Sequence, residues 1–475
     1  MAMVTPPADA QFALAQSLWQ RNEVDRCEAT LRELLTRRPG REDATLLLAE
    51  LLRSQGRLDA ASQAMFEFCR KRDFEPATSI RAARFIQECH RHVLAAEVCD
   101  AAIARGGNDP ALLSLAGNIV RELGEFGKAR SLYLAALDRG VDLNTHFVLG
   151  ALAHTQRYVE ADHPDFGRFS AHFGNEAFTA RSRASAGFAL AKAHDDTHDP
   201  SSAATVLRGS NALVREALPW QPLGWEQFAS ARKLERVARA RVEAAEDFVP
   251  VFIVGLPRSG TTLTAAQLAR HTSARDRGEL RLLRFIAERL IGEGLLGDVQ
   301  AVGEAAQLYR AHARQDDEPA TWYLDQDPLN FRYLHVAAAM FPQARVIVCR
   351  RNLRDTALSL WSQDFAHSDC AFAYDFASIA HYAAGYDDLI RHWQRTLHVP
   401  IHVVEYESLV ADPHGVLEDL REFVGAHRVD TDVAAGPAPI NSSSVWQARQ
   451  PIYSTSIGRW RGYLPYVPEL ERFPE

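Results

Sequence analysis

Apolar helical segments alternate with polar turns through the first third of the chain, and the turns recur at a fixed interval. The segments NEVDRC, GRLDAA, HRHVLA and GEFGKA begin at Asn22, Gly56, His90 and Gly124, so each starts 34 residues after the one before. A weaker fifth copy, QRYVEA, begins at Gln156. Each copy has a small residue at its sixth position, where two helices can approach closely. The pattern predicts helical hairpins that cannot bury their apolar faces alone and therefore stack.

A period of 34 residues is typical of tetratricopeptide repeats, whose units stack into a curved solenoid with a concave groove. We expect such an array over residues 8–174, and an irregular helical bundle is the alternative. The repeat phase is lost after about residue 165, although residues 175–248 remain rich in Ala and Arg. We interpret this second region as helices that cap the array and link it to the rest of the chain.

From Val249 onward the pattern changes to short apolar runs of strand type, separated by helical segments. The runs are VPVFIVG at 249–255, ARVIVCR at 344–350 and VPIHVVEY at 399–406. Strands that alternate with helices predict a central parallel sheet with crossover helices, so we expect an α/β domain over residues 249–475. In such a domain ligands bind at the carboxyl ends of the strands, where all three runs lead into polar or charged residues.

Length and composition narrow the classes of protein without indicating a function. The 475 residues favour two domains, and a net charge of −8 with a sequence pI near 6.1 argues against strong non-specific binding of nucleic acid. The N-terminus lacks a basic region followed by an apolar run, and no stretch approaches the ~20 apolar residues of a membrane span. Six cysteines without C-x-x-C spacing indicate reduced core residues, so we expect a cytoplasmic protein.

The segment VFIVGLPRSGTTL at 251–263 is similar to a phosphate-binding loop with one substitution. Gly255, Gly260 and Thr262 keep the G-x-x-x-x-G-K-[ST] spacing, but Thr261 stands where that motif has lysine. A glycine-rich turn into a helix still offers backbone N–H groups and a helix dipole to an anion. The second strand ends in arginines, not in the acid that a magnesium–triphosphate site needs. The pattern therefore disfavours a nucleoside kinase or triphosphatase.

The cations near this loop favour a ligand with two separate anionic groups and no metal. Arg258 lies inside the loop, and Arg350 with Arg351 follows the second strand. The cofactor 3′-phosphoadenosine 5′-phosphosulfate (PAPS) has that layout, with a phosphosulfate at one end and a phosphate on the ribose.

Here the chain resembles the PAPS-dependent sulfotransferases over roughly residues 249–463. The resemblance rests on PRSGTTL, on an arginine and a serine eight residues apart, on YESLVADP and on the terminal WQARQPIYSTSIGRWRGY. The terminal segment is similar to the cofactor-covering loop of the tyrosylprotein sulfotransferase branch. The preceding repeats resemble bacterial proteins that fuse tetratricopeptide units to this domain.

The resemblance implies a set of ligands for PAPS and for its product, 3′,5′-adenosine bisphosphate, with no metal. Arg351 and Ser359 have the spacing at which the family holds the 3′-phosphate, and the alternative is a surface cation with a helix N-terminal hydroxyl. Arg459 lies where the family has a phosphate-binding lysine. The full implied set is Pro257, Arg258, Ser259, Gly260, Thr261, Thr262, Leu263, Arg351, Ser359, Tyr406, Arg459 and Trp460.

The resemblance also implies three catalytic positions. Glu279, in RDRGELRLL, lies in the stretch where the family has its carboxylate base, and a solvated glutamate near a helix start is the alternative. Ser444 lies where a serine approaches the transferred sulfuryl group. Gln326 departs from the family, which usually has a lysine there, and its amide can donate a hydrogen bond but brings no charge. Three alternatives stay open: Arg332 or a tail arginine supplies that charge, the chain is slower than its relatives, or it binds PAPS without catalysis.

These features favour a sulfotransferase and leave its acceptor open. The preferred acceptor is a tyrosine hydroxyl on a peptide or protein that the repeats recruit. A small-molecule or carbohydrate hydroxyl is the second choice. A scaffold protein with a catalytically weak PAPS-binding domain is the alternative from another class. We expect no nucleic-acid partner and no membrane span, and the oligomeric state stays open, with a homodimer as one option.

Overall fold

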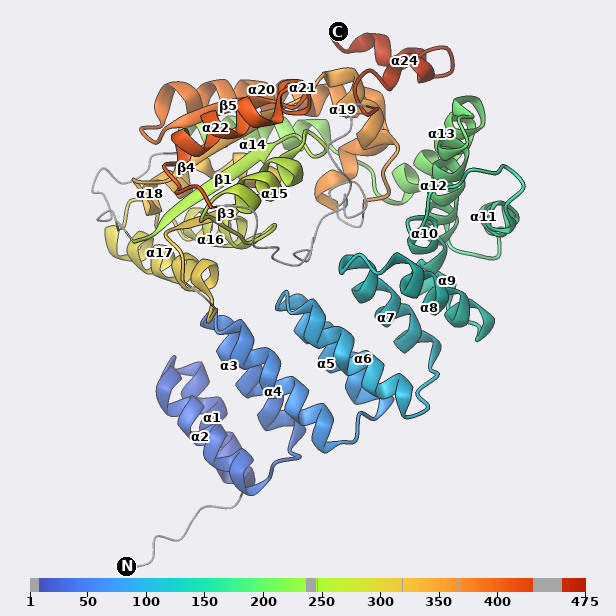
Figure 1. The fold of residues 1–475 in the computed structure, drawn as a ribbon. Coiled ribbons are helices and arrows are strands. Elements are labelled where there is room, and N and C mark those ends of the chain that lie inside the picture. The colour runs from blue at the N-terminus through green and yellow to red at the C-terminus, as the bar shows by residue number, and fades with distance from the viewer. Residues whose placement is uncertain (1–7, 236–244, 246, 318, 366–367, 430–454) are drawn as a thin grey trace, which may run out of the picture. The chain divides into compact units, whose positions relative to one another are not determined.

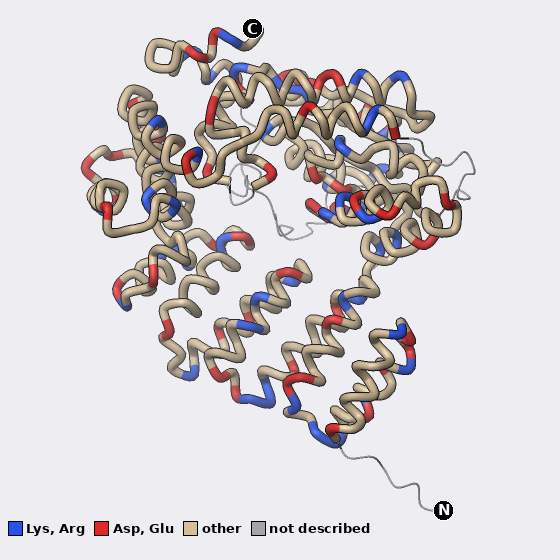
Figure 2. The backbone as a smooth tube through the Cα atoms, turned by 180° about the vertical axis from the view of Figure 1, so that it is seen from behind, with Lys and Arg blue, Asp and Glu red and all other residues tan. Residues whose placement is uncertain are grey.

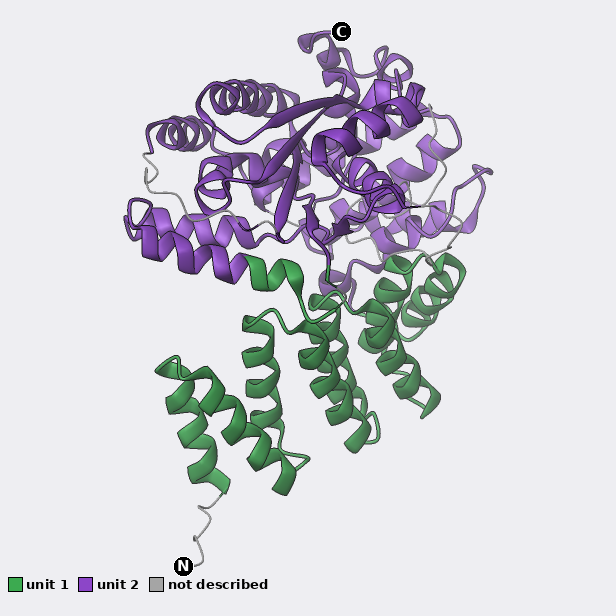
Figure 3. Cartoon of the chain, turned by 60° about the vertical axis from the view of Figure 1, so that its left-hand side comes forward, with its two compact units in different colours: residues 1–141, 310–319 green, residues 142–309, 320–475 purple. Residues whose placement is uncertain are grey.

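The structure is a computed structural model that describes residues 8–235, 245, 247–317, 319–365, 368–429 and 455–475 (Figure 1). The chain divides into two compact units (Figure 3). The first comprises Met1–Val141 and Arg310–Pro319, and the second comprises Asp142–Tyr309 and Ala320–Glu475. The three segments predicted from the sequence group the residues differently, and those boundaries stay a prediction.

Four helical hairpins make up most of the first unit. They are α1 (Ala8–Gln20) with α2 (Val24–Arg37), α3 (Glu42–Ser54) with α4 (Leu58–Lys71), α5 (Pro76–Glu88) with α6 (His92–Ala104), and α7 (Pro110–Glu122) with α8 (Phe126–Asp138). The predicted turns of the first four copies are confirmed, because Asn22, Gly56, His90 and Gly124 all have a left-handed backbone, with φ of 58°, 74°, 59° and 85°. The weaker fifth copy is not such a turn, because Gln156 is not left-handed and the next helix begins only at Pro164. One left-handed residue after a helix satisfies its last carbonyl groups and reverses the chain. The predicted tetratricopeptide-type array is therefore present.

Small residues allow the two helices of each hairpin to pack closely. The residues at the sixth position of the four repeats are all 0% exposed, namely Cys27, Ala61, Ala95 and Ala129. The fourth hairpin has a second close approach, because a Cβ added to Gly117 on α7 would lie 2.5 Å from the Tyr133 ring on α8.

Ion pairs join each hairpin to the one before it. The partners lie about one repeat apart, namely Arg57 with Glu28 at 2.6 Å, Arg91 with Asp59, Arg105 with Asp73 at 2.7 Å, and Lys128 with Asp100 at 2.7 Å. Figure 2 shows that both signs of charge are interspersed along these helices. Exposed pairs contribute roughly 0.2–1 kcal/mol each, so they supplement the apolar contacts between hairpins.

A segment from much later in the chain completes the first unit. The two carboxylate oxygens of Asp316 accept hydrogen bonds from the backbone N–H groups of Asp59 and Ala60, at 2.7 and 2.8 Å. These donors lie in the first turn of α4, where helix N–H groups lack partners within the helix. Gly56 approaches Ala311 so closely that a Cβ would overlap the Ala311 carbonyl oxygen. The unit is therefore built from two separate stretches of the chain.

The second unit begins with six helices and continues into a five-stranded sheet. The helices are α9 (Leu143–His146), α10 (Val148–Ala153), α11 (Pro164–Gly174), α12 (Ala180–Asp196), α13 (Pro200–Ala217) and α14 (Pro222–Leu234). The strands are β1 (Val249–Gly255), β2 (Arg275–Asp276), β3 (Trp322–Asp325), β4 (Arg345–Arg350) and β5 (Ile401–Glu405). All pairings are parallel and the order is β2–β3–β1–β4–β5. The predicted α/β sheet is confirmed, although only β1, β4 and β5 are predictable as apolar runs.

Helical segments cover both faces of this sheet. On one face, Val251 and Ile253 belong to an apolar cluster with residues of α15 and α22. On the other face, the Phe252 ring lies 5.7 Å from that of Tyr309 on α17, which in turn lies 5.3 Å from Phe341. The remaining elements are α15 (Thr261–His271), α16 (Leu282–Gly292), α17 (Val299–Arg314), η1 (Pro328–Tyr333), α18 (Leu334–Met340), α19 (Leu353–Trp361), η2 (Ser368–Tyr374), α20 (Phe376–Thr396), α21 (Tyr406–Ala411), α22 (Pro413–Val424), α24 (Trp460–Tyr463) and η3 (Pro468–Arg472). Within the part of the chain that the structure describes, no helix is long and apolar enough to cross a membrane.

Replacing Gly117 tests the close packing of the fourth hairpin. We expect Gly117→Ala to destabilise α7 and α8 by about 1–3 kcal/mol, because the new methyl group overlaps the Tyr133 ring. Gly127→Ala on α8 is the matched control, since no atom lies within 4 Å of its added Cβ and alanine favours helix. Hydrogen exchange of peptides from α7 and α8 measures both effects. Equal protection in the two variants would contradict the packing argument.

Candidate active site

The loop between β1 and α15 turns the chain through two left-handed residues. The backbone φ is +74° at Arg258 and +103° at Gly260, the residue that caps α15. A Cβ on Gly260 would lie 2.7 Å from the Tyr406 ring, and one on Gly255 would overlap the Ser259 hydroxyl. Both glycines are therefore required by close approach. The other predicted loop residues follow in order, with Pro257 buried and with Thr261, Thr262 and Leu263 in the first turn of α15.

Three of the predicted ligands meet at this loop. The Arg258 Nε donates a hydrogen bond to the Ser359 hydroxyl at 3.0 Å, and Arg351 Nη1 donates to the Arg258 carbonyl at 3.2 Å. Ser359 lies on α19, which follows β4 and the two arginines. The eight-residue spacing of Arg351 and Ser359 thus places both side chains beside the same loop.

Two buried polar atoms in this group have no hydrogen-bond partner among the described residues. They are the hydroxyl of Ser259, which is 2% exposed, and the Nε of Arg351. Burying an unpaired polar group costs free energy that a bound anion would recover. The loop also presents the N-terminus of an 11-residue helix, whose dipole favours negative charge. The chemistry of this donor set therefore fits phosphate-type groups.

Tyr406 and the chain near Ser456 lie against Arg351. The Arg351 guanidinium lies 4.7 Å from the centre of the Tyr406 ring, and its Nη2 donates to the Ser456 carbonyl at 2.6 Å. The Tyr406 and Ser456 hydroxyl groups are hydrogen-bonded at 2.7 Å. Ser456 is a neighbour of the loop that the sequence reasoning missed, because only the tertiary fold brings it to Arg351.

The structure gives the predicted tail ligands other partners. The Trp460 ring lies between the guanidinium groups of Arg354 and Arg461, at 4.4 and 4.7 Å. Arg459 forms an ion pair with Asp195 of α12 at 2.9 Å. Neither side chain is thus brought to the loop, and their predicted contact with the cofactor stays a prediction. Ser444 lies outside the described residues.

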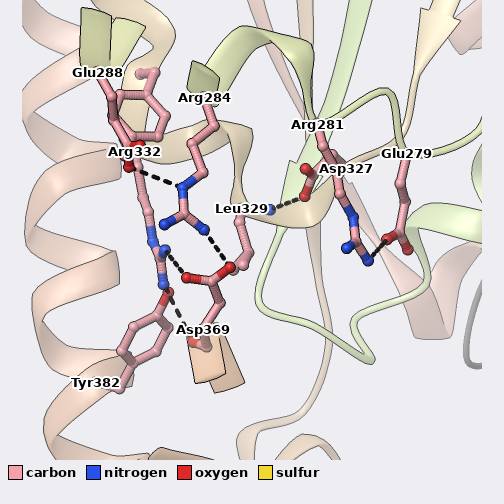
Figure 4. A network of polar contacts seen from close by, with 10 residues as sticks. Glu279, Arg281, Arg284, Glu288, Asp327, Leu329, Arg332, Asp369 and Tyr382 are labelled. Carbon is pink, nitrogen blue, oxygen red and sulfur yellow. Dashed lines mark hydrogen bonds and ion pairs between the residues drawn. The ribbon is translucent and has the colours of Figure 1, made fainter. Parts of the chain in front are cut away.

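The predicted base Glu279 lies in a group of acids beyond β2. Burial, together with the negative charges of Asp327 and Asp325, raises the pKa of Glu279 to about 8. The Arg281 guanidinium, 3.7 Å from the Glu279 carboxylate, opposes this shift (Figure 4). A pKa near the working pH suits a general base, because the carboxylate form is then both present and more basic than that of an ordinary glutamate. A carboxyl group of this kind can accept a proton from a weakly acidic hydroxyl.

Gln326 is buried between two acids, at 3% exposed. Its backbone N–H donates to the Gly278 carbonyl at 2.9 Å, while its side-chain Oε1 has no hydrogen-bond partner among the described residues. Arg332, one predicted substitute for the missing lysine, donates to the Tyr382 hydroxyl at 2.7 Å and pairs with Asp369 at 3.7 Å (Figure 4). The Arg332 charge is therefore already shared with Asp369.

Asp325 and Asp327 are site residues that the sequence prediction did not include. Burial and the charge of Asp327 raise the pKa of Asp325 to about 7, and burial also raises the pKa of Asp327. Their signal in the sequence was two acids flanking the residue that replaces the lysine. Among the described residues, no three His, Cys, Asp or Glu side chains are grouped so that they could hold a metal ion.

A parallel sheet with a glycine-containing loop and a helix N-terminus after its central strand is typical of α/β domains that bind phosphate groups. Residues 250–430 match the family model described as the sulfotransferase family. This part of the chain is therefore similar to the sulfotransferase family.

Several relatives show the same likeness. The chain is 31% identical over 325 residues to an uncharacterized protein of Aquifex aeolicus, and the match covers 63% of this chain and 42% of that protein. It is 25% identical over 255 residues to protein-tyrosine sulfotransferase 1 of Danio rerio, covering 46% of this chain and 68% of the relative. The solved sulfotransferase domain of the Synechococcus PCC 7002 olefin synthase is 20% identical with a TM-score of 0.36, covering 50% of this chain and 98% of that domain.

Replacing Gly260 tests whether the loop holds an anion. We expect Gly260→Ala to weaken binding of 3′,5′-adenosine bisphosphate at least about tenfold, because the methyl group meets the Tyr406 ring and the residue is left-handed. Gly425→Ala is the matched control, because its φ of +80° is also left-handed but no atom lies within 4 Å of the added Cβ. Isothermal calorimetry measures both affinities. Equal affinities would remove the loop from the binding site.

Proposed function

We propose that this chain is a PAPS-dependent sulfotransferase that acts on a tyrosine hydroxyl of a peptide or protein. The observation that carries the proposal is the meeting of Arg258, Arg351 and Ser359 at the loop of a domain similar to the sulfotransferase family. Glu279, on the turn after β2, supports a reaction rather than binding alone.

The proposed division of the ligands follows from charge and geometry. The loop N–H groups and Arg258 would hold the phosphosulfate, since a helix start and a cation both favour an anion. Arg351 and Ser359 would hold the ribose 3′-phosphate. Both residues follow β4 in the chain and both are hydrogen-bonded to Arg258, so they lie beside the loop. The unpartnered Arg351 Nε provides a further donor for that phosphate.

The proposed chemistry uses Glu279 as the general base. Glu279 accepts the proton of the acceptor hydroxyl while the acceptor oxygen bonds to sulfur and the bond from sulfur to the leaving phosphate breaks. PAPS, when bound, supplies the sulfuryl group and leaves as 3′,5′-adenosine bisphosphate. Arg258 and the loop amides stabilise the charge that builds on the leaving phosphate.

A phenolic acceptor fits this base better than an aliphatic alcohol. The pKa of Glu279 is raised to about 8, and that of a tyrosine hydroxyl is about 10, so proton transfer between them is nearly balanced. Three relatives are protein-tyrosine sulfotransferases, from Danio rerio, Gallus gallus and Drosophila melanogaster. We propose that the repeat array recruits the peptide or protein, since solenoids of this type use their concave surface for binding.

A second candidate function is a PAPS-binding scaffold with little activity. The observation that favours it is Gln326, which leaves a neutral amide where the family usually has a lysine. Turnover decides between the two functions, whereas cofactor binding is expected in both.

Binding without a metal tests the proposed cofactor. In the presence of EDTA, we expect 3′,5′-adenosine bisphosphate to bind at least about tenfold more tightly than adenosine 5′-phosphate, which lacks the 3′-phosphate. Arg351→Gln should abolish that difference. Arg345→Gln is the matched control, because Arg345 lies at the opposite end of β4 and its Nη1 donates to the Gln343 carbonyl at 2.9 Å. Calorimetry that shows no preference for the bisphosphate would contradict the proposed 3′-phosphate site.

Turnover and its pH dependence test Glu279. We expect Glu279→Gln to reduce sulfuryl transfer by ~10²-fold or more without changing cofactor affinity. Exposed Glu293→Gln at the end of α16 is the matched control. Because the base acts in its ionised form and its pKa is raised to about 8, the rate should rise about tenfold from pH 7 to 9 and then level off. A rate that is flat over this range would exclude Glu279 as the base.

A further inference from the structure

Asp325 joins the two segments that carry Glu279 and Gln326. Its side chain is 1% exposed at the end of β3. Its Oδ1 accepts hydrogen bonds from the Asp327 N–H at 3.1 Å and, more weakly, from the Leu280 N–H at 3.4 Å. Leu280 directly follows Glu279, and Asp327 directly follows Gln326. One buried carboxyl group therefore contacts the backbone on both sides of the proposed reaction centre.

Backbone pairing aligns the same two segments. The Arg277 N–H donates to the Leu324 carbonyl, and the Gln326 N–H donates to the Gly278 carbonyl, each at 2.9 Å. These bonds continue the β2–β3 ladder for a few residues beyond the short β2. The ladder ends at Gly278, and the next contact between the two segments is the hydrogen bond from the Leu280 N–H to Asp325.

Tyr309 holds Asp325 from the other side. The Tyr309 hydroxyl donates to Asp325 Oδ2 at 2.8 Å, and Tyr309 is 1% exposed. The Tyr309 ring packs between Phe252 of β1 and Phe341. The Tyr309 ring comes from α17 and is buried against the central strand, so it is a rigid support that restricts the position of the Asp325 carboxyl group.

Holding a turn does not by itself require a buried acid. An asparagine could accept the same two backbone hydrogen bonds without the desolvation that a carboxylate suffers. Burial raises the pKa of Asp325 to about 7, whereas the Tyr309 hydroxyl opposes this shift and favours the ionised form. The negative charge of Asp325 also contributes to the raised pKa of Glu279. A carboxyl group at this position thus acts on Glu279 through charge as well as through the backbone.

We propose that Asp325, held by Tyr309, is a positioning residue that aligns Glu279 and Gln326 for sulfuryl transfer. The proposal rests on the proposed role of Glu279 as the base. The groups that act on Glu279 are Asp325 of β3, Asp327 of the following turn and Arg281 of its own segment, and Glu279 in turn acts on the Cys370 thiol of η2. Of these acids, Asp325 also accepts a hydrogen bond from the backbone next to Glu279.

Two substitutions at Asp325 separate charge from position. Asp325→Asn removes the charge but keeps an oxygen that can accept from the two N–H groups. Its NH₂ group can donate a hydrogen bond to the Tyr309 oxygen. We expect its pH midpoint for turnover to fall by about half a unit or more, because a negative neighbour of the base is lost. Asp325→Ala removes both functions, and we expect kcat to fall about tenfold or more while KM for PAPS stays within about threefold.

Substitutions of two buried tyrosines provide the control. Tyr309→Phe removes the support of Asp325 without disturbing the backbone, so kcat should fall, but less than in Asp325→Ala. Tyr323→Phe changes a residue two positions before Asp325 on β3, whose hydroxyl accepts from the Ala320 N–H at 2.9 Å. We expect Tyr323→Phe to keep the wild-type kcat and pH midpoint.

The assay follows formation of 3′,5′-adenosine bisphosphate from PAPS with N-acetyltyrosinamide as the acceptor probe. Hydrogen exchange of residues 277–281 and ¹³C NMR titration of the Glu279 carboxyl group are read on the same full-length variants. Both of these readouts are independent of turnover. Faster exchange in Asp325→Ala, normal exchange in Asp325→Asn and a lower Glu279 midpoint in Asp325→Asn would support the proposal, even if wild-type turnover were absent and the proposed function failed.

Two results would overturn the proposal. The first is unchanged exchange over 277–281 in Asp325→Ala with a wild-type Glu279 midpoint in Asp325→Asn. The second, read only if the wild-type protein turns over, is equal kcat in Tyr309→Phe and Tyr323→Phe. If Asp325→Ala fails to fold, Asp325→Asn and the tyrosine pair still decide the outcome, because these three changes keep the shape of the buried side chains.

Discussion

The parallel pairing of β1 with β3 on one side and β4 on the other is the constraint on which the site depends. The register places Phe252 opposite Asp325 and Gly255 opposite Cys349. Because parallel strands end at one edge, the loop after β1, the acids after β3 and the arginines after β4 emerge together. These groups lie far apart in the sequence, and the sheet alone brings them to one place.

Charge divides the site into two sides. The arginines emerge from β1 and β4, whereas Glu279, Asp325 and Asp327 emerge from β2 and β3. Gln326 lies on the acidic side, where a lysine would have offset the buried negative charge. Without that cation, burial and the mutual repulsion of the acids raise the pKa of Glu279 to about 8 and that of Asp325 to about 7. The raised pKa values of these acids are thus consistent with a neutral residue, Gln326, in place of a lysine.

The sequence predicts those features that repeat or that combine a local pattern with a chemical need. The repeat turns are predictable because a left-handed residue recurs at the same interval, even where it is Asn22 or His90 instead of glycine. The loop is predictable because its two glycines appear in the sequence at a recognisable spacing. The structure explains them, since a Cβ at Gly255 or Gly260 would overlap neighbouring atoms. By contrast, β2 and β3 have only two and four residues, which is too short for a periodic signal.

The site residues that sequence reasoning missed depend on tertiary contacts. Ser456 reaches Arg351 across about a hundred residues of chain. Arg459 pairs with Asp195, which belongs to a helix well before the sheet, and no local pattern predicts such a pair. Asp325 was visible as an acid beside Gln326, but its bonds to Tyr309 and Leu280 follow only from the fold.

The first unit consists of two separate stretches of chain, and this limits how the protein can be dissected. A fragment that stops at Val141 would contain all four hairpins, α1 to α8, and still lack Asp316, which caps the N-terminus of α4. The fragment would also lose Ala311, which packs so closely against Gly56 that no side chain fits there. Counting repeats therefore gives the wrong boundary for an autonomous fragment. A circular permutant or a linker that reattaches residues 310–319 would be needed to isolate the array with its native surface.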